Sequence, residues 1–158
     1  MGTRGSQALM QLLQPKQLLW KLTDLSRQVR QRQTLTADQA LGRKGEDLAH
    51  RYLRSLGFHI LSRNYRVQDG GGEIDIIAKD GKVLVFVEVK SRRSSEFGTP
   101  DRAIDTEKQR RIVRAARSYA LRTGADWSQV RFDVITIVFT SPASITHYQD
   151  AFFPARTI

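Results

Sequence analysis

The chain has 158 residues and contains no cysteine. This absence excludes disulfide bridges, a thiolate zinc site and a cysteine nucleophile. It also agrees with a reducing compartment, so we expect a cytoplasmic protein. Long apolar runs are absent as well. None approaches the roughly 20 residues that span a bilayer, and the leucine-rich N-terminal region is interrupted by Gln14, Pro15, Lys16 and Gln17. We therefore expect neither a membrane span nor a signal peptide.

Acidic residues are few compared with basic ones. Sixteen Asp and Glu stand against 26 Lys and Arg, which gives a net charge of +10. A polyanion is the natural partner of such a protein, and nucleic acid is the commonest polyanion. A generic basic protein kept soluble by its charge is the alternative, because charge by itself does not define a binding site.

Residues 1–35 are predicted to form a basic N-terminal extension, and residues 36–158 a single α/β domain. Half of the net charge, +5, lies within residues 1–43. Leu18, Leu22, Leu25 and Val29 recur at helical spacing, which indicates an amphipathic helix over about 16–32. Such a helix could pack on the domain or on a partner, and it could equally contact phosphates.

The domain alternates patterns typical of helices and strands. Thr36 with Gln39 has the form of a capping box, and Gly124 follows a second helical pattern that we expect to begin at Thr99-Pro100-Asp101. The expected elements are a helix over 36–56, strands over 58–66, 73–78 and 83–87, a helix over about 100–122, a strand over 130–139 and a last strand within 145–153. The order α-β-β-β-α-β predicts an α/β fold with a mixed β-sheet flanked by helices.

Two acidic residues on neighbouring strands carry the chemical signal. If Asp80-Gly81 forms a two-residue hairpin loop, Glu73 lies opposite Glu88, and Asp75 becomes a diagonal neighbour of Glu88. Side chains alternate between faces, so these three residues and Lys90 project from one face. The inference depends on the turn, because a loop one residue longer would move Asp75 to the other face.

Crowded carboxylates repel each other unless a cation bridges them or one takes a proton. Oxygen ligands without cysteine favour Mg²⁺ or Mn²⁺, and such a metal activates water and steadies the leaving oxygen in phosphodiester hydrolysis. Lys90 could position or deprotonate the attacking water, or neutralise charge in the transition state. The competing interpretation is an ordinary solvated strand face, although Asp75 is unusual between Ile74 and Ile76.

Three helical residues extend this candidate site. Lys108 falls inside the apolar arc of the second helix, so it must either reach solvent along the helix or meet an acid. Arg111 borders the same arc, and Glu46 lies at the edge of the apolar arc of the first helix. Arg110, Arg114 and Arg117 form an outward stripe that is more typical of a solvated face.

Several motifs resemble those of the YraN-like family of small bacterial proteins. They are Gly42-Arg43-Lys44-Gly45-Glu46, Tyr52-Leu53, Gly57-Phe58, Asn64-Tyr65-Arg66, residues 72–78, residues 86–92 (Phe-Val-Glu-Val-Lys-Ser-Arg), Lys108 and residues 131–134 (Arg-Phe-Asp-Val). The resemblance covers about residues 40–153. That family is similar to the PD-(D/E)xK nuclease superfamily and distantly to archaeal Holliday-junction resolvases.

The resemblance implies a restriction-endonuclease-like core and a divalent-metal nuclease. It assigns Asp75, Glu88 and Lys90 to the D…ExK positions, and Glu46 to the helical carboxylate that completes the metal site. Ile74 stands where the superfamily's name puts proline, and this departure touches no ligand.

We therefore expect an endonuclease that hydrolyses DNA phosphodiester bonds with Mg²⁺ or Mn²⁺. Branched or damaged DNA is expected among its substrates. Supporting or nucleic-acid-binding roles are expected for Glu73, Lys108, Arg111 and Arg92. The alternatives are a non-catalytic nucleic-acid-binding module and an interaction protein that retains the nuclease fold. A homodimer is expected only by analogy with junction-cutting relatives.

Overall fold

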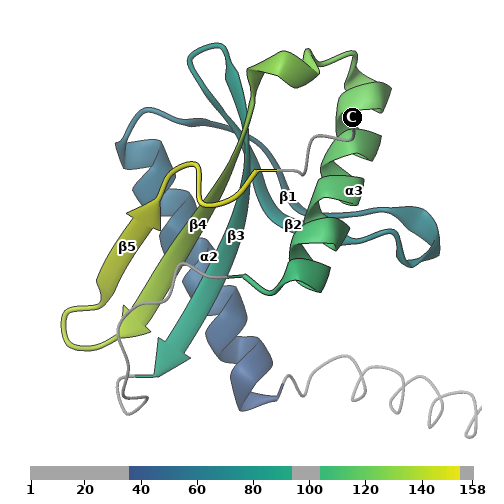
Figure 1. Ribbon diagram of the computed structural model, residues 1–158. Helices are drawn as coiled ribbons and strands as arrows, with labels where there is room; N and C mark the ends of the chain where they lie inside the picture. Colours follow the sequence, from purple (N-terminus) through teal and green to yellow (C-terminus); the bar gives the residue numbers. More distant parts are fainter. Residues whose placement is uncertain (1–35, 94–103, 154–158) are drawn as a thin grey trace, which may run out of the picture. The chain divides into compact units, whose positions relative to one another are not determined.

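The computed structural model describes residues 36–93 and 104–153 (Figure 1). The helices and strands in this part are α2 (Ala37–Ser55), β1 (His59–Arg66), β2 (Glu73–Asp80), β3 (Val83–Arg93), α3 (Thr106–Thr123), β4 (Val130–Phe139) and β5 (Ser144–Tyr148), with short 3₁₀ turns at Gln68–Gly70 and Trp127–Gln129. The predicted helix over 16–32 lies outside the described residues, so it stays a prediction, as does the division of the chain after residue 35.

The five strands form one sheet in the order β1-β2-β3-β4-β5. Strands β3 and β4 are parallel and are joined through α3, whereas the other three neighbouring pairs are antiparallel. The predicted mixed α/β sheet with flanking helices is therefore confirmed (Figure 1).

Each face of the sheet has its own apolar core. Ala49 and Leu53 of α2 pack into one cluster, whereas Ile112 and Ala115 of α3 pack into the other. The helices therefore cover opposite faces of the sheet. Successive buried residues of β3 enter the two clusters in turn, as expected for a strand covered on both sides. Among the described residues, no helix is long and apolar enough to cross a membrane.

Helix α3 begins later than the sequence pattern predicted. Its first residue is Thr106, and the Asp105 carboxylate accepts a hydrogen bond of 2.8 Å from the Lys108 backbone N–H. The predicted start at residues 99–101 is wrong, because this local cap, rather than the proline at position 100, satisfies the first helical turn. The predicted end at Gly124 is confirmed by its φ of +67°.

The hairpin between β2 and β3 turns one residue later than predicted. Asp80 pairs with Val83, so the two-residue loop is Gly81-Lys82 rather than Asp80-Gly81. Gly81 has a φ of +58°, which a glycine adopts without strain. The predicted pairing of Glu73 with Glu88 is therefore wrong. The register differs by two positions, and an even shift leaves the side chains of the paired residues, 76–80, on the faces that were predicted.

Candidate active site

Asp75 and Glu88 lie where strands β2 and β3 separate. Their ladder ends at Ile76 paired with Val87, and one more step of this register would place Asp75 opposite Glu88. In a regular strand, residues two apart point to the same face of the sheet. This pattern breaks in β2 at the same point, because Ile74 packs in the core on the α3 side and Ile76 in the core on the α2 side. The neighbouring strand β1 is distorted there too, since Asn64 has a φ of +51°. The site thus occupies an irregular point of the sheet.

The Asp75 carboxylate replaces the missing ladder contact. Its Oδ2 accepts a hydrogen bond of 2.7 Å from the backbone N–H of Val89. Burial, followed by the negative charge of Glu88, raises the pKa of Asp75 to about 7, against the opposing effects of the Val89 N–H and Lys108. Near neutral pH this side chain therefore exchanges readily between acid and carboxylate.

Glu88 is held beside Asp75 with most of its surface covered. Only 11% of its side chain is exposed, and its Oε1 lies 3.0 Å from Lys108 Nζ. Its other oxygen, Oε2, is buried and accepts no hydrogen bond from an N–H of the described residues, although a protonated Asp75 can donate one to the Glu88 carboxylate. Burial raises the pKa of Glu88 despite the nearby Lys108. A buried carboxylate oxygen without a donor is costly unless a proton or a cation satisfies it.

Lys108 meets an acid, one of the two outcomes that its position in the apolar arc of α3 had suggested. Burial lowers the pKa of its ammonium, but the charge and the hydrogen bond of Glu88 outweigh burial, so the pKa is raised overall. Lys108 therefore supplies one positive charge beside the two acids.

Two further charged residues, Glu46 and Lys90, influence the acid pair. Glu46 of α2 is 17% exposed, and its negative charge contributes to the raised pKa of Asp75. It lies 3.9 Å from Arg63, which makes a closer contact of 2.6 Å with Asp47. Lys90 follows Glu88 by two residues on β3, and its positive charge lowers the pKa of Glu88.

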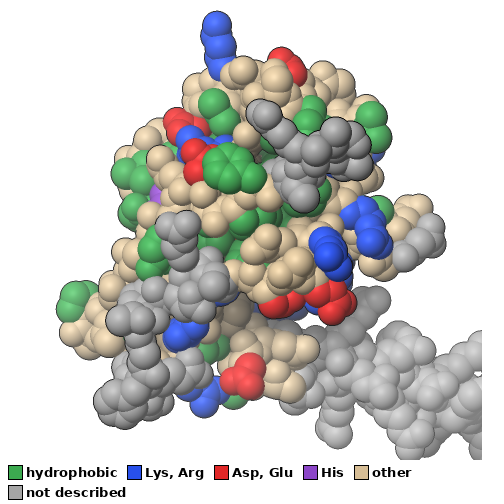
Figure 2. Space-filling model, in the orientation of Figure 1, with side chains coloured by type: hydrophobic (Ala, Val, Ile, Leu, Met, Phe, Trp, Pro, Cys, Tyr) green, Lys and Arg blue, Asp and Glu red, His purple; other side chains and the backbone are tan. Residues whose placement is uncertain are grey.

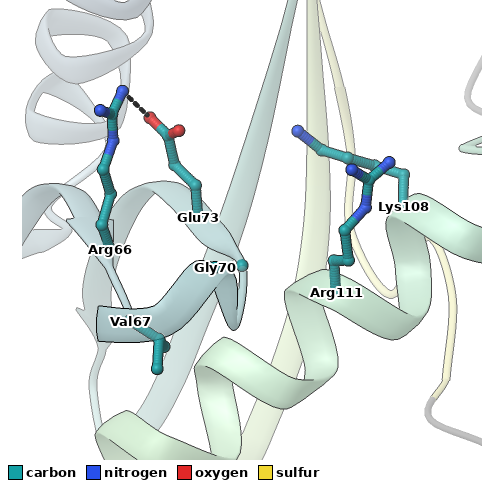
Figure 3. A pocket seen from close by; sticks show the side chains of 7 residues that line it. Arg66, Val67, Gly70, Glu73, Lys108 and Arg111 are labelled. Carbon is teal, nitrogen blue, oxygen red and sulfur yellow. Dashed lines mark hydrogen bonds and ion pairs between the residues drawn. The ribbon is translucent and has the colours of Figure 1, made fainter.

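The remaining predicted residues lie beside this pair rather than within it. Glu73 forms an ion pair of 3.1 Å with Arg66, and both line a cavity together with Lys108 and Arg111 (Figure 3). In Figure 2, basic and acidic side chains gather together near the lower right of the described surface. Arg92 lies four residues beyond Glu88, about 13 Å along the strand at 3.3 Å per residue, so its role stays a prediction.

Sequence reasoning missed Arg66, although a signal was available. Arg66 is the last residue of β1 and pairs in the ladder with Glu73, the first residue of β2. The short connection between the two strands could have suggested that pairing. Arg63 was missed as well, because its partners on α2 are distant in sequence and no local pattern points to them.

A second buried charge cluster lies away from this pair. Asp133 is fully buried and is bound by Arg131 at 2.9 Å and by His147 Nε2 at 2.9 Å. Arg131 also contacts Asp80 at 2.9 Å, which ties β4 to the end of β2. The hydrogen bonds of Asp133 lower the pKa of its carboxyl group, although burial acts in the opposite direction. Each member has a partner within the protein, so this cluster is structural.

The acid pair fits a hard divalent cation. Within residues 36–93 and 104–153, no three His, Asp or Glu side chains converge closely enough to enclose an ion by themselves. Mg²⁺, however, is usually held by one or two carboxylates, with water and substrate phosphates as the other ligands. Asp75 and Glu88 supply that number, and the unsatisfied Oε2 of Glu88 offers an oxygen ligand.

Comparison with known proteins identifies the family of the chain. Residues 45–137 match the model of the uncharacterised protein family UPF0102. A UPF0102 protein of Solibacter usitatus is 50% identical over 111 residues, which cover 70% of this chain and 84% of that protein. One from Geobacter sulfurreducens is 47% identical over 117 residues, or 73% and 90% of the two chains. One from Rhodococcus opacus is 47% identical over 115 residues, or 72% and 96%. The chain therefore belongs to the UPF0102 family of YraN-like proteins.

Proposed function

We propose that this protein is a divalent-metal-dependent nuclease that hydrolyses DNA phosphodiester bonds. The observation that carries the proposal is the buried pair of Asp75 and Glu88. The pKa of Asp75 is raised, and the buried Oε2 of Glu88 has no hydrogen-bond donor among the N–H groups of the described residues. Structural acids are normally paired completely, as Asp133 is. An incompletely satisfied acid pair beside two lysines is instead typical of a site that awaits a cation and a phosphate.

The roles of the side chains follow from their positions. Asp75 and Glu88 would hold Mg²⁺ or Mn²⁺, with Glu46 close enough to influence the same charge. When bound, the ion supplies Lewis-acid activation of water and stabilises charge on the phosphoryl oxygens. Lys90 would orient the attacking water or neutralise that charge, and Lys108, which lies 3.0 Å from Glu88, would favour the ionised form of Glu88 and hold it in position.

The resemblance to the PD-(D/E)xK superfamily supports the proposal independently. Asp75, Glu88 and Lys90 match its acid, acid and lysine positions, and the charge of Glu88 acts on Asp75 although the predicted register was wrong by two. The alternative is a nucleic-acid-binding module without activity. A module of that kind has no need for two acids next to the phosphate that it binds, because they would repel it.

The decisive test is cleavage of DNA by the purified full-length chain in Mg²⁺ or Mn²⁺. We expect activity that EDTA abolishes, and that Asp75→Ala or Lys90→Ala abolishes without preventing DNA binding. Arg114→Ala is the control for a lost charge, because Arg114 is exposed on α3. Its activity should stay close to that of the wild type.

Two outcomes would overturn the assignment. Cleavage that persists in Asp75→Ala would reveal a contaminating nuclease, and DNA binding without cleavage in either metal would favour the non-catalytic module. Duplex, single-stranded, flap and four-way-junction DNA should be tested side by side, with single-stranded RNA as the comparison, because the acid pair does not distinguish between these substrates.

A further inference from the structure

A cavity of about 470 Å³ opens between the connection of β1 to β2 and the beginning of α3. Its lining includes Arg66, Gly70, Gly72, Glu73, Lys108 and Arg111. Figure 3 shows Lys108 and Arg111 extending from α3 on one side, with Arg66 and Glu73 on the other. The volume falls in the range of about 300–1,000 Å³ that is typical of small-molecule sites.

The cavity adjoins the acid pair through Lys108. Lys108 lines it and at the same time lies 3.0 Å from Glu88. Glu73 also lines it and precedes Asp75 by two residues on β2. If a phosphate of a nucleic-acid strand bound at the acid pair, the cavity would therefore be close enough to hold the adjacent nucleotide of the same strand.

The charges of the cavity favour an anion. Three cationic side chains, Arg66, Lys108 and Arg111, stand against the single carboxylate of Glu73. The pairs made by the two arginines are weak. Arg66 is 72% exposed in its pair with Glu73, and Arg111 lies 3.9 Å from Glu107 with half of its side chain exposed. Exposed ion pairs contribute little to stability, so a phosphate could take over these guanidinium groups at low cost.

Gly72 fixes the distance between the two walls. Its φ is +121°, and a side chain at this position would collide with the backbone carbonyl of Arg111. The start of β2 therefore lies directly against the backbone of α3. Since the walls touch here, the cavity keeps its width without a ligand, and the cost of ordering it on binding is small.

We propose that this cavity binds one nucleotide of a single strand, next to the phosphodiester bond at the acid pair, with Arg111 and Arg66 on its phosphate. The proposal rests on the proposed nuclease function and narrows its substrate. A double helix presents grooves about 6 and 12 Å wide and needs an open surface, whereas a recess of this size accommodates a single unpaired unit. The preferred substrate therefore has an unpaired segment at the cut, such as a flap, an overhang or a single strand.

The first experiment measures binding without cleavage. Thymidine 3′,5′-bisphosphate is titrated calorimetrically into the full-length protein in EDTA, with the 5′- and 3′-monophosphates as probes of which phosphate matters. We expect Arg111→Ala to weaken binding at least tenfold, because it removes a charge-assisted contact. Arg114→Ala removes the same charge from the same helix outside the cavity, and it should stay within twofold of the wild type.

The bisphosphate result separates the cavity from the general basic charge. Equal loss in Arg111→Ala and Arg114→Ala would overturn the cavity, as would no binding at millimolar concentration. Circular dichroism of both variants shows that any difference is not due to unfolding. Arg66→Ala tests the opposite wall of the cavity, and it should also weaken binding of the bisphosphate.

The second experiment compares cleavage of a single-stranded and a fully paired oligonucleotide in Mn²⁺. We expect the wild type and Arg114→Ala to prefer the single strand, and Arg111→Ala to lose most of that preference. Cleavage that is equal in both arginine variants would overturn the cavity while the nuclease assignment stands. Arg111-dependent nucleotide binding by a protein that cuts nothing would refute the nuclease assignment and leave the cavity as a nucleotide site.

Discussion

Replacing Asp75 by asparagine is expected to stabilise the metal-free protein at neutral and alkaline pH, although it removes an acid that the proposed reaction needs. Asparagine has nearly the same shape, and its carbonyl can still accept the hydrogen bond of 2.7 Å from the Val89 N–H. Its amide can also donate to the Glu88 carboxylate at every pH, whereas in the wild type Asp75 can do so only while it is protonated. The variant would lose only the ionisation of Asp75.

The magnitude follows from the pKa of Asp75, which is about 7 in the folded protein against an ordinary value of 3.8. Each pKa unit corresponds to 1.36 kcal/mol, so ionising this acid costs about 4 kcal/mol of folding stability well above pH 7. Because the folded pKa is the higher one, the stabilising contribution is complete below about pH 4 and is lost as the pH rises through 7. Roughly 2–3 kcal/mol of this loss falls between pH 5 and 8.

The assay is urea unfolding in EDTA, followed by circular dichroism at several pH values between 5 and 8. We expect the difference in unfolding free energy between Asp75→Asn and the wild type to grow by about 2–3 kcal/mol over this range. Other titrating groups are common to both proteins and largely cancel in the difference. Asp75→Ala should gain less, because it leaves the Val89 N–H without its acceptor.

A difference that does not change with pH would refute this reasoning. It would mean that Asp75 is already a stable carboxylate at pH 5, satisfied by its surroundings. The inference that the acid pair has room for a cation would lose its electrostatic basis with it.

Two further predictions concern stability. Gly45→Ala should destabilise the protein by about 1–3 kcal/mol, because its Cβ would collide with Ser91 Oγ. Gly42→Ala on the same helix meets no atom and should stabilise the protein by up to about 1 kcal/mol. Thermal unfolding of both variants would contradict this prediction if their midpoints changed alike. Asp133→Ala should cost about 3–5 kcal/mol at pH 7, since it leaves a buried partner such as His147 unsatisfied. Because the pKa of Asp133 is lowered, the loss should shrink as the pH falls below about 4, which denaturant titration at pH 3 and 7 would show.

The order of helices and strands could be predicted because it depends on local pattern. Apolar spacing and glycine placed α2, the end of α3 and β4 within one or two residues. The start of α3 was not placed in this way, because the pattern at Thr99-Pro100-Asp101 drew the prediction away from Asp105, which caps the helix in the structure. Residues 94–103 lie outside the described part.

The acid pair could be predicted in part. That Asp75 and Glu88 share a site depends on the parity of the hairpin register, and an error of two positions preserves parity. Their exact pairing could not be predicted, because it depends on the hairpin loop, which lies one residue later than the pattern predicted. The residues next to Asp75 and Asn64 in the sequence give no signal of the irregular backbone at this point of the sheet.

The cavity beside the pair was beyond sequence reasoning. It brings together residues from β1, β2 and α3, and its width depends on the contact of Gly72 with the backbone of Arg111. Lys108 and Arg111 were found because helical periodicity is regular. Arg66 was not, because its place depends on how the connection from β1 to β2 lies against α3.

Strand β3 divides into two halves that should respond to substitution in opposite ways. Residues 84–87 are at most 4% exposed and pack in both cores, whereas residues 88–92 are only partly buried and carry Glu88 and Lys90. A scan of single substitutions along this strand should therefore show thermal stability falling in the first half. In the second half the fold should persist while the response to metal and nucleic acid changes. The pattern of tolerance to mutation along the eleven residues of β3 would thus locate the boundary between the residues that stabilise the fold and those that serve the proposed site.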